Sequence, residues 1–133
     1  MWRSSSSPTA VFRSYAVDEA ELLRTRLGGA YQDETALQDH IERLLSENNT
    51  VFTREYIISP RDRIDFILAD GTGIEVKVAG SVTSLNRQLV RYAENDCIQR
   101  LIIVTTKRTH LPGMLRKIGE ITITPIIVSR GFC

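Results

Sequence analysis

Residues 63–78 constrain the fold of this chain more than any other segment, because apolar and polar side chains alternate on both sides of a turn. Strict alternation over residues 63–68, and again over 74–78, is typical of β-strands with one buried face. The intervening Asp70-Gly71-Thr72-Gly73 is rich in residues that tolerate a positive φ. The segment therefore predicts a β-hairpin.

Folding the two strands about residue 70 gives a definite register. A slip by one residue would turn a carboxylate into the core, where an unpaired charge is very unfavourable. The pairs that face each other in this register are Asp65 with Glu75, Phe66 with Ile74, and Ile64 with Val76. We expect one continuous apolar face across both strands, and a charged cluster on the other.

Asp65, Glu75 and Lys77 form that cluster. Two adjacent carboxylates repel each other and raise each other's pKa, and a divalent cation removes the repulsion. Hard oxygen ligands favour Mg²⁺, with Mn²⁺ as a substitute. Lys77 can hold an attacking water or stabilise charge on a phosphate. The alternative is a cross-strand salt bridge on a solvated sheet face, but the apolar surroundings favour a functional site.

Two helices are predicted before the hairpin, over residues 18–27 and 33–47. The second has an apolar stripe of Leu37, Ile41, Leu44 and Leu45. Glu34 projects from the inner edge of that stripe, whereas Glu42 lies off it. Glu34 is therefore a candidate site residue, and its other interpretation is an acid in the first helical turn. An extended strand over residues 51–59 follows, with Phe52, Ile57 and Ile58 as core candidates.

A third helix is predicted over residues 82–95, with Leu85, Leu89 and Tyr92 facing inward. Gln88, Arg91 and Tyr92 can share one face of it. If that face overlooks the charged cluster, Gln88 can orient Lys77 or a water, and Arg91 can bind a phosphate. A polar rim on an amphipathic helix is the alternative.

The remaining chain predicts one central strand and a less regular C-terminal part. Residues 101–104 are continuously apolar, as in a strand buried on both faces. A basic loop over 105–110 and a short helix over 111–118 should follow. The last strand, residues 121–128, contains Pro125 and should therefore lie near a sheet edge.

The Asp65, Glu75 and Lys77 set, in the order helix, hairpin, helix and strand, resembles the PD-(D/E)XK nuclease superfamily over about residues 30–130. The proline that gives the superfamily its name is absent, since Ile64 precedes Asp65. The resemblance implies an α/β fold, in which a mixed central β-sheet is flanked by helices on both faces in a restriction-endonuclease-like core.

The resemblance also implies a function, namely a Mg²⁺-dependent DNA endonuclease of repair, recombination or phage and mobile-element DNA processing, with branched DNA as one candidate substrate. Asp65, Glu75 and the Val76 carbonyl would bind the metal, with Glu34 assisting through a water. Lys77 would position the nucleophilic water, and Gln88 would support it. Small members of one domain often act as homodimers.

Charge is distributed unevenly along a chain whose net charge is +1. Residues 1–75 hold 8 Lys and Arg against 13 Asp and Glu, whereas residues 76–133 hold 9 against 3. The basic half could follow a phosphate backbone, although a solvated surface gives the same imbalance. The candidate nucleic-acid-binding residues are Arg87, Arg91, Lys107 and Arg108.

The chain suits one domain, residues 15–133, after a Ser-rich arm over residues 1–14. Cys97 and Cys133 suggest free thiols in the cytoplasm, and no apolar run is long enough for a membrane span. An alternative function stays open, namely a catalytically silent nucleic-acid-binding or assembly module of the same fold. A nuclease acting on RNA ranks below both.

Overall fold

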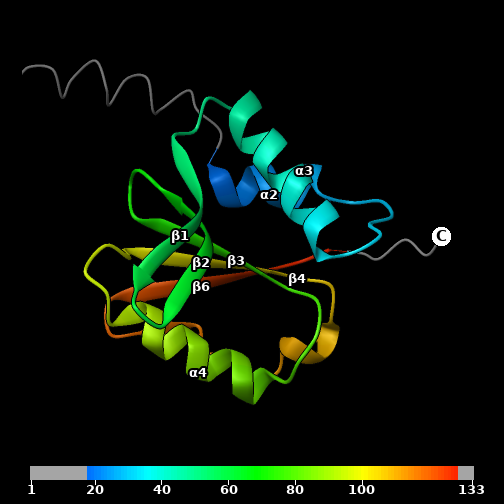
Figure 1. The fold of residues 1–133 in the computed structure, drawn as a ribbon. Coiled ribbons are helices and arrows are strands. Elements are labelled where there is room, and N and C mark those ends of the chain that lie inside the picture. Colours follow the sequence, from blue (N-terminus) through cyan, green and yellow to red (C-terminus); the bar gives the residue numbers. More distant parts are fainter. Residues whose placement is uncertain (1–17, 129–133) are drawn as a thin grey trace, which may run out of the picture.

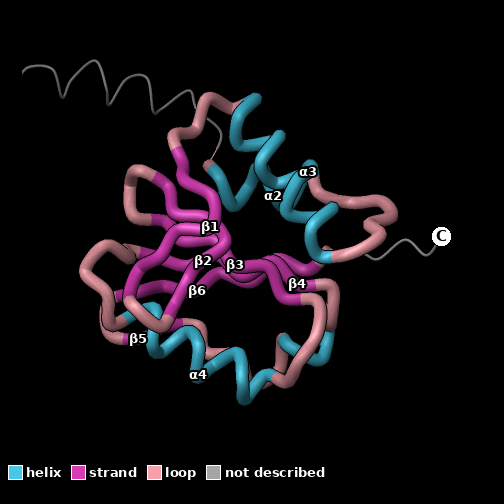
Figure 2. Tube along the Cα trace, viewed as in Figure 1, coloured by secondary structure: helices cyan, strands magenta, loops and turns pink. Residues whose placement is uncertain are grey.

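The structure is a computed structural model that describes residues 18–128 (Figures 1 and 2). The expected arm over residues 1–14 and Cys133 lie outside the described part. Helices and strands follow in the order α2 (Glu19–Arg26), α3 (Glu34–Glu47), β1 (Phe52–Ser59), β2 (Asp62–Leu68), β3 (Thr72–Lys77), α4 (Val82–Ala93), β4 (Arg100–Thr105), β5 (Lys117–Ile118) and β6 (Ile121–Ile127).

The strands form one mixed sheet in the order β1-β2-β3-β4-β6-β5. The strands β1, β2 and β3 are antiparallel neighbours, whereas β3, β4 and β6 run parallel. Helices α2 and α3 lie on one face, and α4 lies on the other (Figure 1). The protein is therefore an α/β protein with a mixed sheet flanked by helices, which confirms the predicted fold class.

Each face of the sheet carries its own apolar core. The core under α2 and α3 contains Leu22, Leu23, Leu37, Ile41, Leu44, Leu45, Phe66, Leu68, Ile74, Val76, Ile102, Val104, Ile126 and Val128. The core under α4 contains Ile64, Leu85, Leu89, Tyr92, Ile98, Leu101, Ile103, Met114 and Ile123. The predicted stripes of α3 and α4 are thus confirmed, and alternate residues of β4 enter opposite cores, as expected of a central strand.

The helix starts follow local capping chemistry. Asp33 Oδ1 accepts a hydrogen bond from the N–H of Ala36 at 2.9 Å, which caps α3. Asp18 caps α2 in the same way, through the N–H of Ala20 at 2.8 Å. None of the described helices combines the length and apolar character needed to cross a lipid bilayer.

The hairpin turn between β2 and β3 is fixed at Gly71, whose φ is +89°. Its N–H donates to the Leu68 carbonyl at 3.0 Å, and its carbonyl accepts from Gln99 at 2.8 Å. The β2–β3 ladder contains the pairs Phe66 with Ile74 and Ile67 with Gly73, which is the predicted register. The turn thus sets which residues of the two strands face each other.

One part of the hairpin prediction is wrong, because Ile64 and Val76 lie on opposite faces of the sheet. The β2–β3 ladder stops before Asp65, and Glu55, opposite Asp65 on β1, has a left-handed φ of +56°. Beyond this distortion Ile64 turns toward α4 and fills the space above Gly73. The apolar face is therefore not continuous along the hairpin.

Two further expectations also differ from the structure. Ile57 is 68% exposed rather than a core residue, since it lies on the edge strand β1 beyond the distortion at Glu55. Residues 111–118 form turns and the short strand β5 rather than a helix, because Gly113 has a φ of +83°. Within the predicted basic loop, His110 is buried, and its ring bonds Thr105 and Gly80.

The edge position of Pro125 is confirmed. Strand β5 pairs with β6 only at Ile121 and Thr122, so that Pro125 lies beyond the end of β5. On its other side Pro125 pairs with Ile103 of β4. A proline is tolerated there because no strand on the outer side requires its missing N–H.

Replacing Gly71 with alanine should destabilise the fold by at least about 2 kcal/mol. The new Cβ would take a left-handed backbone and lie 2.9 Å from Gln99 Cβ and 3.2 Å from the Cys97 carbonyl oxygen. Denaturant unfolding measures the effect. Gly28→Ala is the control, because a Cβ added at Gly28 would have no neighbour within 4 Å. Equal stability of the two variants would contradict this account of the turn.

Candidate active site

The carboxylates of Asp65 and Glu75 lie between β2 and β3, where the ladder between the two strands stops. The N–H of Val76 donates to Asp65 Oδ2 at 2.8 Å, and the N–H of Asp65 donates to Glu75 Oε1 at 3.2 Å. Each carboxylate thus takes the place of a backbone carbonyl of the opposite strand. We call these two groups the carboxylate pair.

Glu75 is the more buried member, with an exposed fraction of 5%. Its Oε2 accepts a hydrogen bond from Gln88 Nε2 at 3.3 Å and lies 3.6 Å from Lys77 Nζ. Gln88 also donates to the Tyr92 hydroxyl at 2.7 Å, and that hydroxyl donates to the Arg63 carbonyl at 3.1 Å. Helix α4 therefore holds Glu75 through Gln88, which itself is held by a buried tyrosine.

Burial is the main influence on the acidity of this pair. It raises the pKa of Glu75 to about 8, and the neighbouring Asp65 charge adds to the rise, whereas Lys77 opposes it. Burial also raises the pKa of Asp65, against hydrogen bonds from Val76 and Gln38 and the charge of Lys77. Two acids thus share one nearby ammonium group, and their repulsion when both are ionised favours a bound proton on Glu75 in the metal-free protein.

Helix α3 approaches the pair from the other face of the sheet. Burial and the charge of Asp65 raise the pKa of Glu34, and the charge of Lys77 opposes the rise. Glu42 instead binds Arg54 at 2.6 Å. Glu42 is thus engaged by Arg54 on β1, whereas Glu34 interacts with Asp65 and Lys77, and the site role of Glu34 stays a prediction.

Gln38 was missed in the sequence, although it lies one helical turn after Glu34. Its side chain is buried, and its Nε2 donates to Glu34 Oε2 at 3.3 Å. Gln38 follows the apolar residue Leu37, but nothing in the sequence pattern distinguishes it from an ordinary solvated glutamine.

The donor set suits a hard divalent cation but is small. Within residues 18–128, no three acidic, histidine or cysteine side chains converge as a metal-binding group. The carboxylate pair offers anionic oxygens whose mutual repulsion a cation would relieve. Glu34 is linked to the pair through Gln38, whose Nε2 donates to Glu34 Oε2 at 3.3 Å. The residues thus fit Mg²⁺ bound by the pair, with water completing its shell.

The candidate phosphate-binding residues are spread over two parts of the surface. Arg91 Nε donates to both carboxylate oxygens of Asp62, at 3.0 and 3.3 Å, so this side chain is held by an acid rather than free. Lys107 Nζ donates to the Gly80 carbonyl at 3.3 Å, and Arg87 and Arg108 are exposed. Lys107 and Arg108 follow the end of β4 that lies beside Lys77.

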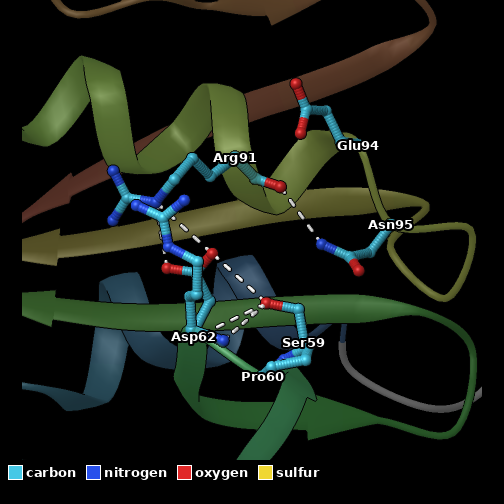
Figure 3. A pocket seen from close by; sticks show the side chains of 7 residues that line it. Ser59, Pro60, Asp62, Arg91, Glu94 and Asn95 are labelled. Carbon is cyan, nitrogen blue, oxygen red and sulfur yellow. Dashed lines mark hydrogen bonds and ion pairs between the residues drawn. The ribbon is translucent and has the colours of Figure 1, made fainter.

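A pocket of about 340 Å³ adjoins Arg91 at the turn between β1 and β2 (Figure 3). Its wall contains Ser59, Pro60, Arg61, Asp62, Arg91, Glu94 and Asn95. Figure 3 shows the Arg91 side chain directed at Asp62, with Ser59 on the far side of that carboxylate. The Ser59 hydroxyl and the Arg91 guanidinium both bind Asp62, so the ion pair orders this turn against α4.

Comparison of the chain with protein-family models, with curated proteins and with solved structures finds no match.

The stability of the metal-free protein should fall, relative to that of Glu75→Gln, as the pH rises from 4.5 to about 8. The folded pKa lies above the unfolded value of 4.5, so the folded state binds more protons in this window. The contribution of Glu75 protonation to the free energy of unfolding is complete below pH 4.5 and is lost above about pH 8. Above that pH, the variant should be more stable by a few kcal/mol.

Chemical unfolding with a chelator present, repeated across this pH range, measures the difference. Glu120→Gln is the matched control, because Glu120 is exposed in the turn between β5 and β6. A stability difference between Glu75→Gln and the wild type that stays constant with pH would count against a buried, proton-binding Glu75.

Proposed function

We propose that this chain is a Mg²⁺-dependent DNA nuclease of the PD-(D/E)XK superfamily. The main support is the carboxylate pair, which lies where the ladder between β2 and β3 stops. Lys77 Nζ lies 3.6 Å from the Glu75 carboxylate. Polar side chains from both helical layers surround this pair, namely Glu34 and Gln38 from α3 and Gln88 from α4. Such convergence of ionisable groups in a buried place is typical of a catalytic site.

The carboxylate pair would hold the metal, with the Val76 carbonyl as a further ligand and Glu34 acting through a water. When bound, Mg²⁺ would polarise the scissile phosphate and lower the pKa of a bound water. Gln88 keeps the Glu75 carboxylate in place by donating to Oε2.

Lys77 supplies the positive charge of the site itself. It lies at the end of β3 with its side chain partly exposed, so that its ammonium is reachable from solvent. A water hydrogen-bonded to Nζ would be oriented toward the phosphorus atom, and the ammonium would stabilise negative charge on the phosphate oxygens. Lys77 thus positions the nucleophile while the pair holds the cation.

DNA is the proposed substrate, and the basic half of the chain supports that choice. Lys107 and Arg108 follow β4 next to the end of β3 that bears Lys77, so a phosphate backbone could run from the site across this end of the sheet. Arg87 lies exposed on α4, beside the face that carries Gln88. The Asp62 partner of Arg91 leaves this residue a smaller part in binding the backbone.

Lys77→Ala should lower Mg²⁺-dependent DNA cleavage by about 10²-fold or more, because it removes the ammonium that orients the nucleophile. Supercoiled, branched, nicked, linear and single-stranded DNA form the substrate panel, each with Mg²⁺, Mn²⁺ or a chelator. Lys117→Ala is the matched control, since Lys117 is exposed on β5 at the opposite edge of the sheet from β1. DNA binding without cleavage of any substrate would instead support a silent nucleic-acid-binding module.

A further inference from the structure

Gln38 is a buried side chain whose two polar atoms contact groups of opposite charge. Its exposed fraction is 8%. Its Oε1 accepts a hydrogen bond from Arg54 at 3.2 Å, and its Nε2 donates to Glu34 at 3.3 Å. The amide therefore links a cation on β1 to the acidic side of the candidate active site.

Arg54 is held firmly in this position. One terminal nitrogen donates to Asp39 at 2.7 Å and to Glu42 at 2.6 Å, both on α3. The guanidinium also lies over the ring of Phe66, 5.8 Å from its centroid. Only 22% of the Arg54 side chain is exposed, whereas the side chains of Asp39 and Glu42 are about half exposed.

The chemistry of arginine then decides the orientation of the Gln38 amide. A guanidinium has hydrogen-bond donors and no acceptor, so only the carbonyl oxygen of the amide can face it. The NH₂ group must therefore face the other way, toward Glu34 and Asp65. Gln38 is among the groups whose hydrogen bonds oppose the burial-driven rise in the pKa of Asp65, which agrees with this orientation.

We propose that Gln38 is a positioning residue for the acidic side of the site, and that Arg54 sets its orientation. The inference rests on the proposed function. A neutral NH₂ donor can order the carboxylates of Glu34 and Asp65 without adding a further negative charge beside the pair. Groups that hold metal ligands in this way contribute about 10–100-fold to metal affinity or activity.

The role also explains why an arginine with three partners lies so near an acidic site without neutralising it. Arg54 directs its charge to Asp39 and Glu42, which lie on the outer side of α3. Only a single N–H of its other terminal nitrogen reaches Gln38. Arg54 thus acts on the site through the amide, and the carboxylates keep their charge for a cation.

The test uses Gln38→Met, Arg54→Met and the double variant, with Arg43→Met as the control on the exposed side of α3. Mn²⁺ affinity is measured by electron paramagnetic resonance, and DNA cleavage is measured against Mg²⁺ concentration. Gln38→Met should weaken Mn²⁺ binding about 10–100-fold. Arg54→Met should weaken it in the same direction, and the double variant should be no weaker than Gln38→Met, since Arg54 acts through Gln38.

A second measurement does not depend on metal or activity. In the ¹⁵N-labelled metal-free protein, the side-chain NH₂ of Gln38 should exchange slowly with solvent, and Arg54→Met should abolish this protection. Thermal unfolding identifies any variant that has lost the fold. If Arg54→Met has lost it, the exchange of the Gln38 NH₂ is measured on Arg54→Lys instead. Unchanged Gln38 exchange in a folded Arg54 variant would overturn the link between the two residues.

The outcomes separate this inference from the function on which it rests. A wild-type protein that binds Mn²⁺ and cleaves DNA, with Gln38→Met equal to it in both, would overturn the role of Gln38 and leave the nuclease proposal intact. A wild-type protein that neither binds Mn²⁺ nor cleaves DNA would overturn both.

Discussion

The structure of the candidate site depends on two side-chain carboxylates. They accept backbone hydrogen bonds where the ladder between the two strands of the hairpin is interrupted. Asp65 binds the Val76 N–H and Glu75 binds the Asp65 N–H, so that two N–H groups left by the broken ladder are satisfied. The same bonds hold the two acids side by side, in a place where water cannot separate their charges. The same two hydrogen bonds therefore determine how Asp65 and Glu75 face each other, how they are buried and how their charges repel.

Both layers of helices are needed to keep this arrangement closed. Helix α4 covers Glu75 and binds it through Gln88, and α3 brings Glu34 and Gln38 to the side of Asp65. If one face of the sheet were uncovered, water would reach the carboxylate pair and weaken the electrostatic interactions within it. The α/β architecture thus sets the low-dielectric surroundings that raise the pKa of both acids.

Periodicity in the sequence was sufficient for helices α2, α3 and α4, for the central strand and for the pair Phe66 with Ile74, because each depends on local alternation or on a turn. It failed over residues 111–118, where Gly113 has a positive φ, and where a backbone distortion changes the face of a residue. Ile64 and Ile57 lie beyond the left-handed Glu55, and no propensity of glutamate indicates that conformation. Gln38 was missed for another reason, since its role depends on Arg54, a residue of a different element that only the tertiary fold brings near.

A purely structural role does not account for the carboxylate pair. Asparagine at position 65 and glutamine at position 75 would accept the same two backbone hydrogen bonds, and neutral amides are far less unfavourable to bury than carboxylates. Two acids at these positions add mutual repulsion that a single ammonium, 3.6 Å from Glu75, offsets only in part. The repair of the ladder therefore explains why polar groups lie between the strands, but not why both are acids. Under the proposed function, a ligand of positive charge would supply the missing reason, because it would turn the repulsion between the two carboxylates into shared attraction.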